Sequence, residues 1–201
     1  LDRMFRYRHQ LLKHDLENYA GKTAPKRILV TGASGTIGSA LVPFLKTCGH
    51  QVVQLVRQRE GLEEGQVFWD PYEGKTDLDT SQVFDAVINL NGVDISRGRW
   101  TASQKKKIID SRVLPTVYLA GLISSFEHKP EVFISSSAIG YYGDQADRVL
   151  AETAQKGDCF ISHVCDEWEK ASRTAEKSGI RTIPLRIGIV LTSAGGALQR
   201  M

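Results

Sequence analysis

A short apolar run that enters a glycine-rich turn constrains the fold more than any other part of this chain. Residues 27–38 read Arg-Ile-Leu-Val-Thr-Gly-Ala-Ser-Gly-Thr-Ile-Gly, and an apolar helical pattern follows as far as Leu45. A strand that meets a helix through glycines leaves backbone N–H groups free at the positive end of the helix, where a pyrophosphate binds. The turn therefore predicts a dinucleotide site, although glycine spacing alone also fits a plain strand–turn–helix connection.

The three glycines of this turn have separate expected tasks. Gly32 permits a tight turn, Gly35 lets the backbone approach a phosphate closely, and Gly38 lets the helix pack on the strand. Their spacing is G-x-x-G-x-x-G rather than the G-x-G-x-x-G of many dinucleotide sites, so the strand before and the helix after carry much of the prediction.

The residue after the next predicted strand, at 51–56, bears on the choice of cofactor. A fold that binds NAD usually has an acidic residue there, which accepts hydrogen bonds from the ribose hydroxyls, whereas an arginine suits the extra phosphate of NADP. This chain has Arg57, with Arg59 close behind it and Glu60 as the first acid. Ser34 could add a hydroxyl to the same phosphate. The sequence favours NADP(H) over NAD(H), with an ordinary solvated arginine as the alternative.

Strand and helix patterns alternate from Lys26 onward. Strands are predicted at 27–31, 51–56, 66–69, 85–90, 131–136 and 181–187, and helices at 36–48, 101–125 and 160–178. This order predicts a doubly wound parallel sheet, a three-layer α/β/α Rossmann fold over 26–201. Residues 1–25 predict a short N-terminal helix, which could dock on the Rossmann body, and a linker with Gly21 and Pro25.

Composition is that of an ordinary soluble globular protein. Of 201 residues, 41% are hydrophobic and 24% charged, and the net charge of +3 gives no argument for a nucleic-acid partner. The chain has no apolar run of about 18 residues, so we expect a cytoplasmic protein without a membrane partner. Cys48, Cys159 and Cys165 lack metal-ligand spacing, which favours reduced thiols and no metal site. The oligomeric state stays open.

Further segments strengthen a family resemblance that begins with the glycine turn. They are residues 68–71 (Phe-Trp-Asp-Pro), 111–113 (Ser-Arg-Val) and 185–191 (Leu-Arg-Ile-Gly-Ile-Val-Leu). With them the chain resembles the extended short-chain dehydrogenase/reductase superfamily, in particular the NAD-dependent epimerase/dehydratase family and its SDR39U1-like subgroup, called cell-division-inhibitor-related. The resemblance covers 26–201.

This resemblance implies a dinucleotide lying across the glycine turn and an unidentified small-molecule substrate. The residues that it places against the cofactor are Gly32, Ser34, Gly35, Thr36, Ile37 and Gly38 in the turn, and Leu90, Asn91 and Gly92 after the strand at 85–90. A plain strand-ending turn is the alternative at 90–92. The segment Met4–Gln10 is similar to the last helix of a START-like domain, so we expect a domain junction at the start of the chain. We expect a smaller substrate-binding domain to follow Met201.

Catalysis is expected after the strand at 131–136. The stretch there resembles the serine-rich turn of UDP-galactose 4-epimerase-like enzymes, whose third serine donates a hydrogen bond to the reacting oxygen and matches Ser137. A polar exit from the sheet is the alternative. Relatives that transfer hydride use Tyr-x-x-x-Lys on the next helix, and this chain lacks that motif. The matching positions are Ile161 and Cys165, which we expect on the helix face toward the nicotinamide.

Tyr141 and Tyr142 are the remaining candidates for proton transfer. The segment 166–170, which contains Glu169, predicts the solvated side of a helix whose Trp168 packs inward. Two functions stay open. One is an NADP(H)-dependent oxidoreductase or epimerase with an atypical active site, and the other is a non-catalytic NADP(H)-binding module that senses redox state or binds a partner.

Overall fold

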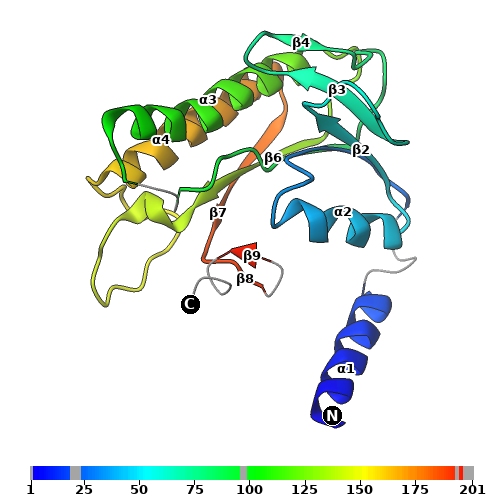
Figure 1. The fold of residues 1–201 in the computed structure, drawn as a ribbon, viewed down its shortest axis with the longest axis horizontal. Coiled ribbons are helices and arrows are strands. Elements are labelled where there is room, and N and C mark those ends of the chain that lie inside the picture. The colour runs from blue at the N-terminus through cyan, green and yellow to red at the C-terminus, as the bar shows by residue number, and fades with distance from the viewer. Residues whose placement is uncertain (1, 19–23, 96–98, 193–194, 197–201) are drawn as a thin grey trace.

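A twisted sheet of seven strands forms the centre of the protein (Figure 1). The structure is a computed structural model that describes residues 2–18, 24–95, 99–192 and 195–196. The strand order is β4-β3-β2-β1-β5-β6-β7, and all neighbours are parallel except β3 and β4. The bounds are β1 Arg27–Thr31, β2 Gln51–Val56, β3 Gln66–Asp70, β4 Lys75–Thr76, β5 Ala86–Asn89, β6 Val132–Ala138 and β7 Arg181–Ile187. A separate antiparallel pair is formed by β8 (Leu191–Thr192) and β9 (Gly195–Gly196).

Helices cover both faces of this sheet. Figure 1 shows α3 and α4 side by side over one face and α2 on the other side. The α-helices are α1 Asp2–Asn18, α2 Gly38–Thr47, α3 Ala102–Ser124 and α4 Phe160–Arg173, and the 3-10 helices are η1 Ile139–Tyr142 and η2 Thr174–Ser178.

Alternating side chains of β1 belong to two separate cores. Leu29 packs with Leu119 of α3, whereas Ile28 and Val30 pack with Val42 of α2. Successive side chains of a strand point to opposite faces, so this alternation places one layer of helices on each side of the sheet. The predicted doubly wound α/β fold is confirmed.

The largest differences from the predicted elements lie at short or terminal segments. The strand β4 has only two residues and was not predicted, and the last part of the helix predicted at 160–178 is the 3-10 helix η2. The N-terminal helix is present, but the side chains of Phe5, Tyr7, Leu11 and Leu12 are exposed, so these side chains do not dock on the Rossmann body. Of the predicted linker, residues 19–23, with Gly21, lie outside the described residues. No helix in the described part of the chain is long and apolar enough to cross a bilayer.

Candidate functional site

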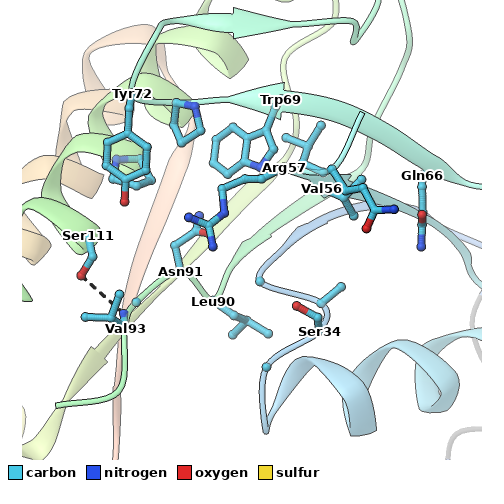
Figure 2. Close-up of a pocket in the computed structure, with 18 residues that line it drawn as sticks. Ser34, Val56, Arg57, Gln66, Trp69, Tyr72, Leu90, Asn91, Val93 and Ser111 are labelled. Atoms are coloured by element: carbon cyan, nitrogen blue, oxygen red, sulfur yellow. Dashed lines mark hydrogen bonds between the residues drawn. The ribbon is translucent and has the colours of Figure 1, made fainter. Parts of the chain in front are cut away.

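A cavity of about 430 Å³ opens at the carboxyl end of the sheet (Figure 2). Its walls are formed by residues of β2 and β3, by the segments that follow β1, β2, β3 and β5, and by Ser111 and Pro115 of α3. The chain leaves β1 toward β2 on one side of the sheet, and β5 pairs with β1 on the other side. The cavity therefore lies where the strand order reverses, which is where ligands bind in doubly wound sheets.

The glycine turn has the geometry that its sequence predicts. Gly32 has a φ of +70°, and a Cβ there would lie 2.6 Å from the carbonyl oxygen of Leu90. A Cβ on Gly38 would collide with the backbone of Gly32 and Ala33, so only glycine lets α2 start this close to β1. Gly35 lines the cavity and donates its N–H to the Gly32 oxygen over 3.0 Å.

Backbone donors remain available beside this turn. Within the described residues, no hydrogen bond engages the backbone N–H groups of Thr36 and Ile37, which directly precede α2. Neither residue lines the cavity itself, but they are the two residues that follow Gly35, which does. The positive end of a helix with free N–H groups favours an anionic ligand.

Arg57 and Arg59 follow the same strand but have different surroundings. Arg59 forms an ion pair with Asp77 at 3.3 Å, and its Cζ lies 4.7 Å from the centre of the Phe68 ring. Arg57 is exposed, and Figure 2 shows it reaching into the cavity between Trp69 and Asn91. No hydrogen bond or ion pair joins Arg57 to another residue in the part of the chain that the structure describes.

Hydrogen bonds hold the turn after β5 in place. The side chain of Asn91 donates to the hydroxyl of Thr31 over 2.8 Å and to Asn89 over 2.7 Å. Asn89 is buried and donates in turn to Thr116 and Ser135. This network connects β1, β5, β6 and α3, so the segment at 90–92 forms a fixed wall of the cavity.

A second polar cluster, which we call the β6 cluster, lies at the end of β6 and consists of Ser137, Glu169, Arg186, Tyr141 and Tyr142. Ser137 is 2% exposed and donates its hydroxyl to Glu169 Oε1 over 2.7 Å. Arg186 binds both oxygens of Glu169, at 2.8 and 2.9 Å. The parallel pairing of β6 and β7 sets Ser137 beside Arg186, and α4 brings Glu169 over both.

The prediction that Glu169 is solvated is wrong. The side chain is only 6% exposed, because α4 turns its Cys165–Glu169 face toward β6 and β7. Hydrogen bonding to the Glu169 carboxylate raises the pKa of Arg186 above its ordinary value. The inward packing of Trp168 is confirmed, since it is 6% exposed.

Both tyrosines of η1 are in contact with Arg186. The Tyr142 hydroxyl oxygen accepts a hydrogen bond from Arg186 Nη1 over 2.9 Å, and the Tyr142 side chain is buried. The Arg186 Cζ lies 3.6 Å from the centre of the Tyr141 ring. The guanidinium therefore holds both rings beside Glu169 at one end of the sheet.

One family model matches this chain, the NAD dependent epimerase/dehydratase family, over residues 28–190. The match covers most of the chain, from β1 to the end of the parallel sheet. The chain belongs to this family.

Individual members of the epimerase/dehydratase family are similar over most of the chain. Epimerase family protein Mb2239 of Mycobacterium bovis is 38% identical over 174 residues, which are 87% of this chain and 57% of that protein. The SDR39U1 homolog of Arabidopsis thaliana, named as chloroplastic, is 36% identical over 190 residues, 90% of this chain and 53% of that protein. The chain thus spans about half the length of the curated relatives that it matches.

Solved structures of related proteins have the same architecture. The match with the nucleoside-diphosphate sugar epimerase of Corynebacterium glutamicum has a TM-score of 0.81 and a sequence identity of 35%. It covers 98% of this chain and 42% of the epimerase chain. The match with human epimerase family protein SDR39U1, solved with NADPH, has a TM-score of 0.76 and a sequence identity of 30%. It covers 87% of this chain and 57% of the human chain.

Ile161 and Cys165, which the family resemblance matches to the tyrosine and lysine of hydride-transferring relatives, both lie on α4. Ile161 lies close to Gly140, since a Cβ on that glycine would collide with the isoleucine side chain. Cys165 is 2% exposed and adjoins Ser137 and Ala138, and burial raises the pKa of its thiol. Both lie on the α4 face that meets the end of β6. Ile161 has no titratable group, and burial favours the protonated form of the Cys165 thiol.

The structure divides the predicted site residues between two places. The cavity is lined by seven of them: Gly32, Ser34, Gly35, Arg57, Leu90, Asn91 and Gly92. Thr36, Ile37 and Gly38 adjoin it, whereas Ser137, Tyr141 and Tyr142 belong to the β6 cluster.

Sequence reasoning missed several site residues. Trp69 near the end of β3, and Pro71 and Tyr72 just after it, line the cavity, although the sequence drew attention to residues 68–71 only through the family resemblance. It also missed the pairing of Glu169 with Arg186. A charged residue inside the apolar strand at 181–187 was a usable signal, because a buried arginine requires a partner.

Proposed function

We propose that this domain binds NADP(H) in the cavity and takes part in hydride transfer on a small-molecule substrate through an atypical active site. The observation that carries the proposal is Arg57, a cation directed into the cavity with no partner among the described residues. An unpaired guanidinium in a dinucleotide cavity suits the 2′-phosphate that distinguishes NADP from NAD.

The residues in and beside the cavity suit the pyrophosphate, the 2′-phosphate and the adenine of this cofactor. Thr36 and Ile37 would donate their free backbone N–H groups to the pyrophosphate, next to the positive end of α2. Arg57 and Ser34 would hold the 2′-phosphate, and the aromatic side chain of Tyr72 would face the adenine. The human relative solved with NADPH supports the same choice of cofactor.

Bound NADPH would supply a hydride, and the chain would then have to deliver a proton to the reacting oxygen. Ser137 directs its own proton to Glu169, so in this state its hydroxyl is an acceptor rather than a donor. Tyr142 accepts a hydrogen bond from Arg186 and retains its proton for donation. We therefore expect Tyr142, with Tyr141 beside it, to be the proton donor, and the Ser137 oxygen to orient the substrate by accepting a hydrogen bond from a substrate hydroxyl.

A second candidate function is a non-catalytic NADP(H)-binding module. The sequence contains no Tyr-x-x-x-Lys motif, and this absence favours a module that binds the cofactor without turnover. Incubating full-length protein and its Tyr142→Phe variant with NADPH and a panel of carbonyl compounds separates the two. Oxidation of NADPH by the wild type that falls in the variant supports the enzyme, and no oxidation with any compound supports the module.

Calorimetric titration of NADPH and NADH tests the choice of cofactor. We expect Arg57→Ala to weaken NADPH binding by about tenfold to a hundredfold, because a charge-assisted hydrogen bond contributes roughly 1.5–3 kcal/mol. NADH binding should not change. Arg59→Ala is the matched control, since Arg59 is already paired with Asp77 and should not affect either ligand. Equal wild-type affinities for NADPH and NADH would contradict the proposal.

A further inference from the structure

One end of the cavity is formed by Gly92, Val93 and Ser111. A second arginine, Arg112 on α3, lies behind this end. Its Nη1 donates to the carbonyl oxygen of Ile108 over 3.1 Å and to the Ser111 hydroxyl over 3.3 Å. Its Nη2 donates to the carbonyl oxygen of Val93 over 3.0 Å. All three acceptors are neutral.

The positive charge of Arg112 is not neutralised by a close carboxylate. In the described ranges of the chain, no Asp or Glu lies within ion-pair distance of its guanidinium, and Asp94 attracts it only from farther away. Cys165 is the other group that acts on it electrostatically, and burial raises the pKa of that thiol, which keeps it neutral. A partly buried cation without a counter-charge is costly, so an anionic ligand nearby would be favourable.

Arg112 also has donors to spare. A guanidinium carries five N–H groups, and three of them are engaged. The Nε–H and one N–H of Nη2 have no partner among the residues that the structure describes. The Arg112 guanidinium packs directly against Gly92 in the cavity wall. A Cβ added to Gly92 would lie only 3.2 Å from both Cζ and Nη2 of Arg112.

We propose that Arg112 is a cofactor-binding residue that supplies, from α3, the cation that Tyr-x-x-x-Lys enzymes carry on the helix after β6. Its free N–H groups would bind the hydroxyls of the nicotinamide ribose beside Gly92, and its charge would favour the phosphate attached to that ribose, which adenosine 2′,5′-bisphosphate lacks. Its contact with Trp168, three residues after Cys165 on α4, supports this role, because the family resemblance matches Cys165 to the lysine. The ring of Trp168, 5.2 Å from its Cζ, keeps the guanidinium in place. The inference rests on the proposed binding of NADP(H).

Two ligands that share the adenosine end of the cofactor distinguish the role of Arg112 from that of Arg57. NADPH contains the nicotinamide ribose, and adenosine 2′,5′-bisphosphate does not. We expect Arg112→Met to weaken NADPH binding by about tenfold to a hundredfold and to leave bisphosphate binding unchanged, since only NADPH reaches Arg112. Arg57→Ala should weaken the binding of both ligands. Arg112→Lys should recover part of the NADPH affinity because it retains the charge.

Calorimetry on these variants, with exposed Arg173→Met as the control, gives a decisive set of outcomes. Retained bisphosphate binding shows that the Arg112 variants are folded. Unchanged NADPH affinity in Arg112→Met would overturn the role of Arg112 and leave the proposed cofactor intact. An equal loss for both ligands would also overturn it, since that result means general damage to the site. Wild-type protein that binds neither ligand would overturn both proposals.

Discussion

The cavity and the β6 cluster lie at the same edge of the sheet but differ in how their polar groups are satisfied. Around the cavity, Arg57 and the N–H groups of Thr36 and Ile37 have no partners among the described residues. In the β6 cluster, the hydroxyl of Ser137 and both oxygens of Glu169 are bound within the protein. The unpaired donors around the cavity indicate a site prepared for an anionic ligand, whereas the paired groups of the β6 cluster also hold β6, β7 and α4 together.

The difference has an energetic basis. Arg57 is solvated, so it keeps its hydration until a ligand arrives, and a phosphate can replace water at little cost. Glu169 and Arg186 have lost most of their hydration, and each depends on the other for compensation. We therefore expect changes in the β6 cluster to affect stability first, and changes around the cavity to affect binding first.

The largest effect is expected from Glu169→Gln. This change leaves Arg186 with an unpaired, mostly buried charge, which should lower the free energy of unfolding by about 3–5 kcal/mol. Urea denaturation measures this change in the free energy of unfolding. The control is Glu176→Gln, whose partner Arg173 is 51% exposed, and it should cost about 1 kcal/mol or less. Similar losses in the two variants would mean that the buried pair does not stabilise the fold more than a surface pair does.

Gly35→Val tests the cavity directly. The new side chain would stand where the glycine turn faces the cavity, so NADPH affinity should fall by at least about a hundredfold. The fold should persist, because the closest atom to a Cβ there is the Gly32 oxygen, at 3.3 Å. Circular dichroism should accompany the titration. Gly121→Val, on an open face of α3, should leave the affinity unchanged. A folded Gly35→Val protein with normal NADPH affinity would refute this placement of the cofactor.

Ser137→Ala should have the smallest effect. It removes one hydrogen bond from Glu169, whose two contacts with Arg186 remain, and should cost about 1–2 kcal/mol of unfolding free energy. NADPH affinity should stay at the wild-type value, since Ser137 does not line the cavity. A loss of affinity as large as that of Arg57→Ala would show that the two regions are not separate.

Local patterns were sufficient for most of the fold. The apolar strand β1, the glycine turn and the helical spacing of α2 all lie within the consecutive residues 27–47, so neighbouring residues determine this part of the fold. The position of Arg57 beside the cavity could be predicted for the same reason, because Arg57 directly follows the last residue of β2. The bounds of β1, β2 and β7 agree with the predicted ones.

Long-range contacts could not be predicted in this way. Glu169 and Arg186 are brought together by the packing of α4 on β7, and no local pattern reveals which helix face turns inward when it carries a carboxylate. The same limit applies to Arg112, whose neighbours come from α4 and from the turn after β5. The two-residue strand β4 has too few residues to show a period of its own.

A crystal structure of the protein with NADPH tests the contrast between the two regions most directly. The account predicts that the 2′-phosphate lies within hydrogen-bond distance of Arg57 and that the pyrophosphate accepts from the N–H groups of Thr36 and Ile37. It also predicts that Ser137 still donates to Glu169. A 2′-phosphate bound away from Arg57, or a Ser137 hydroxyl turned from Glu169 to the nicotinamide, would contradict it.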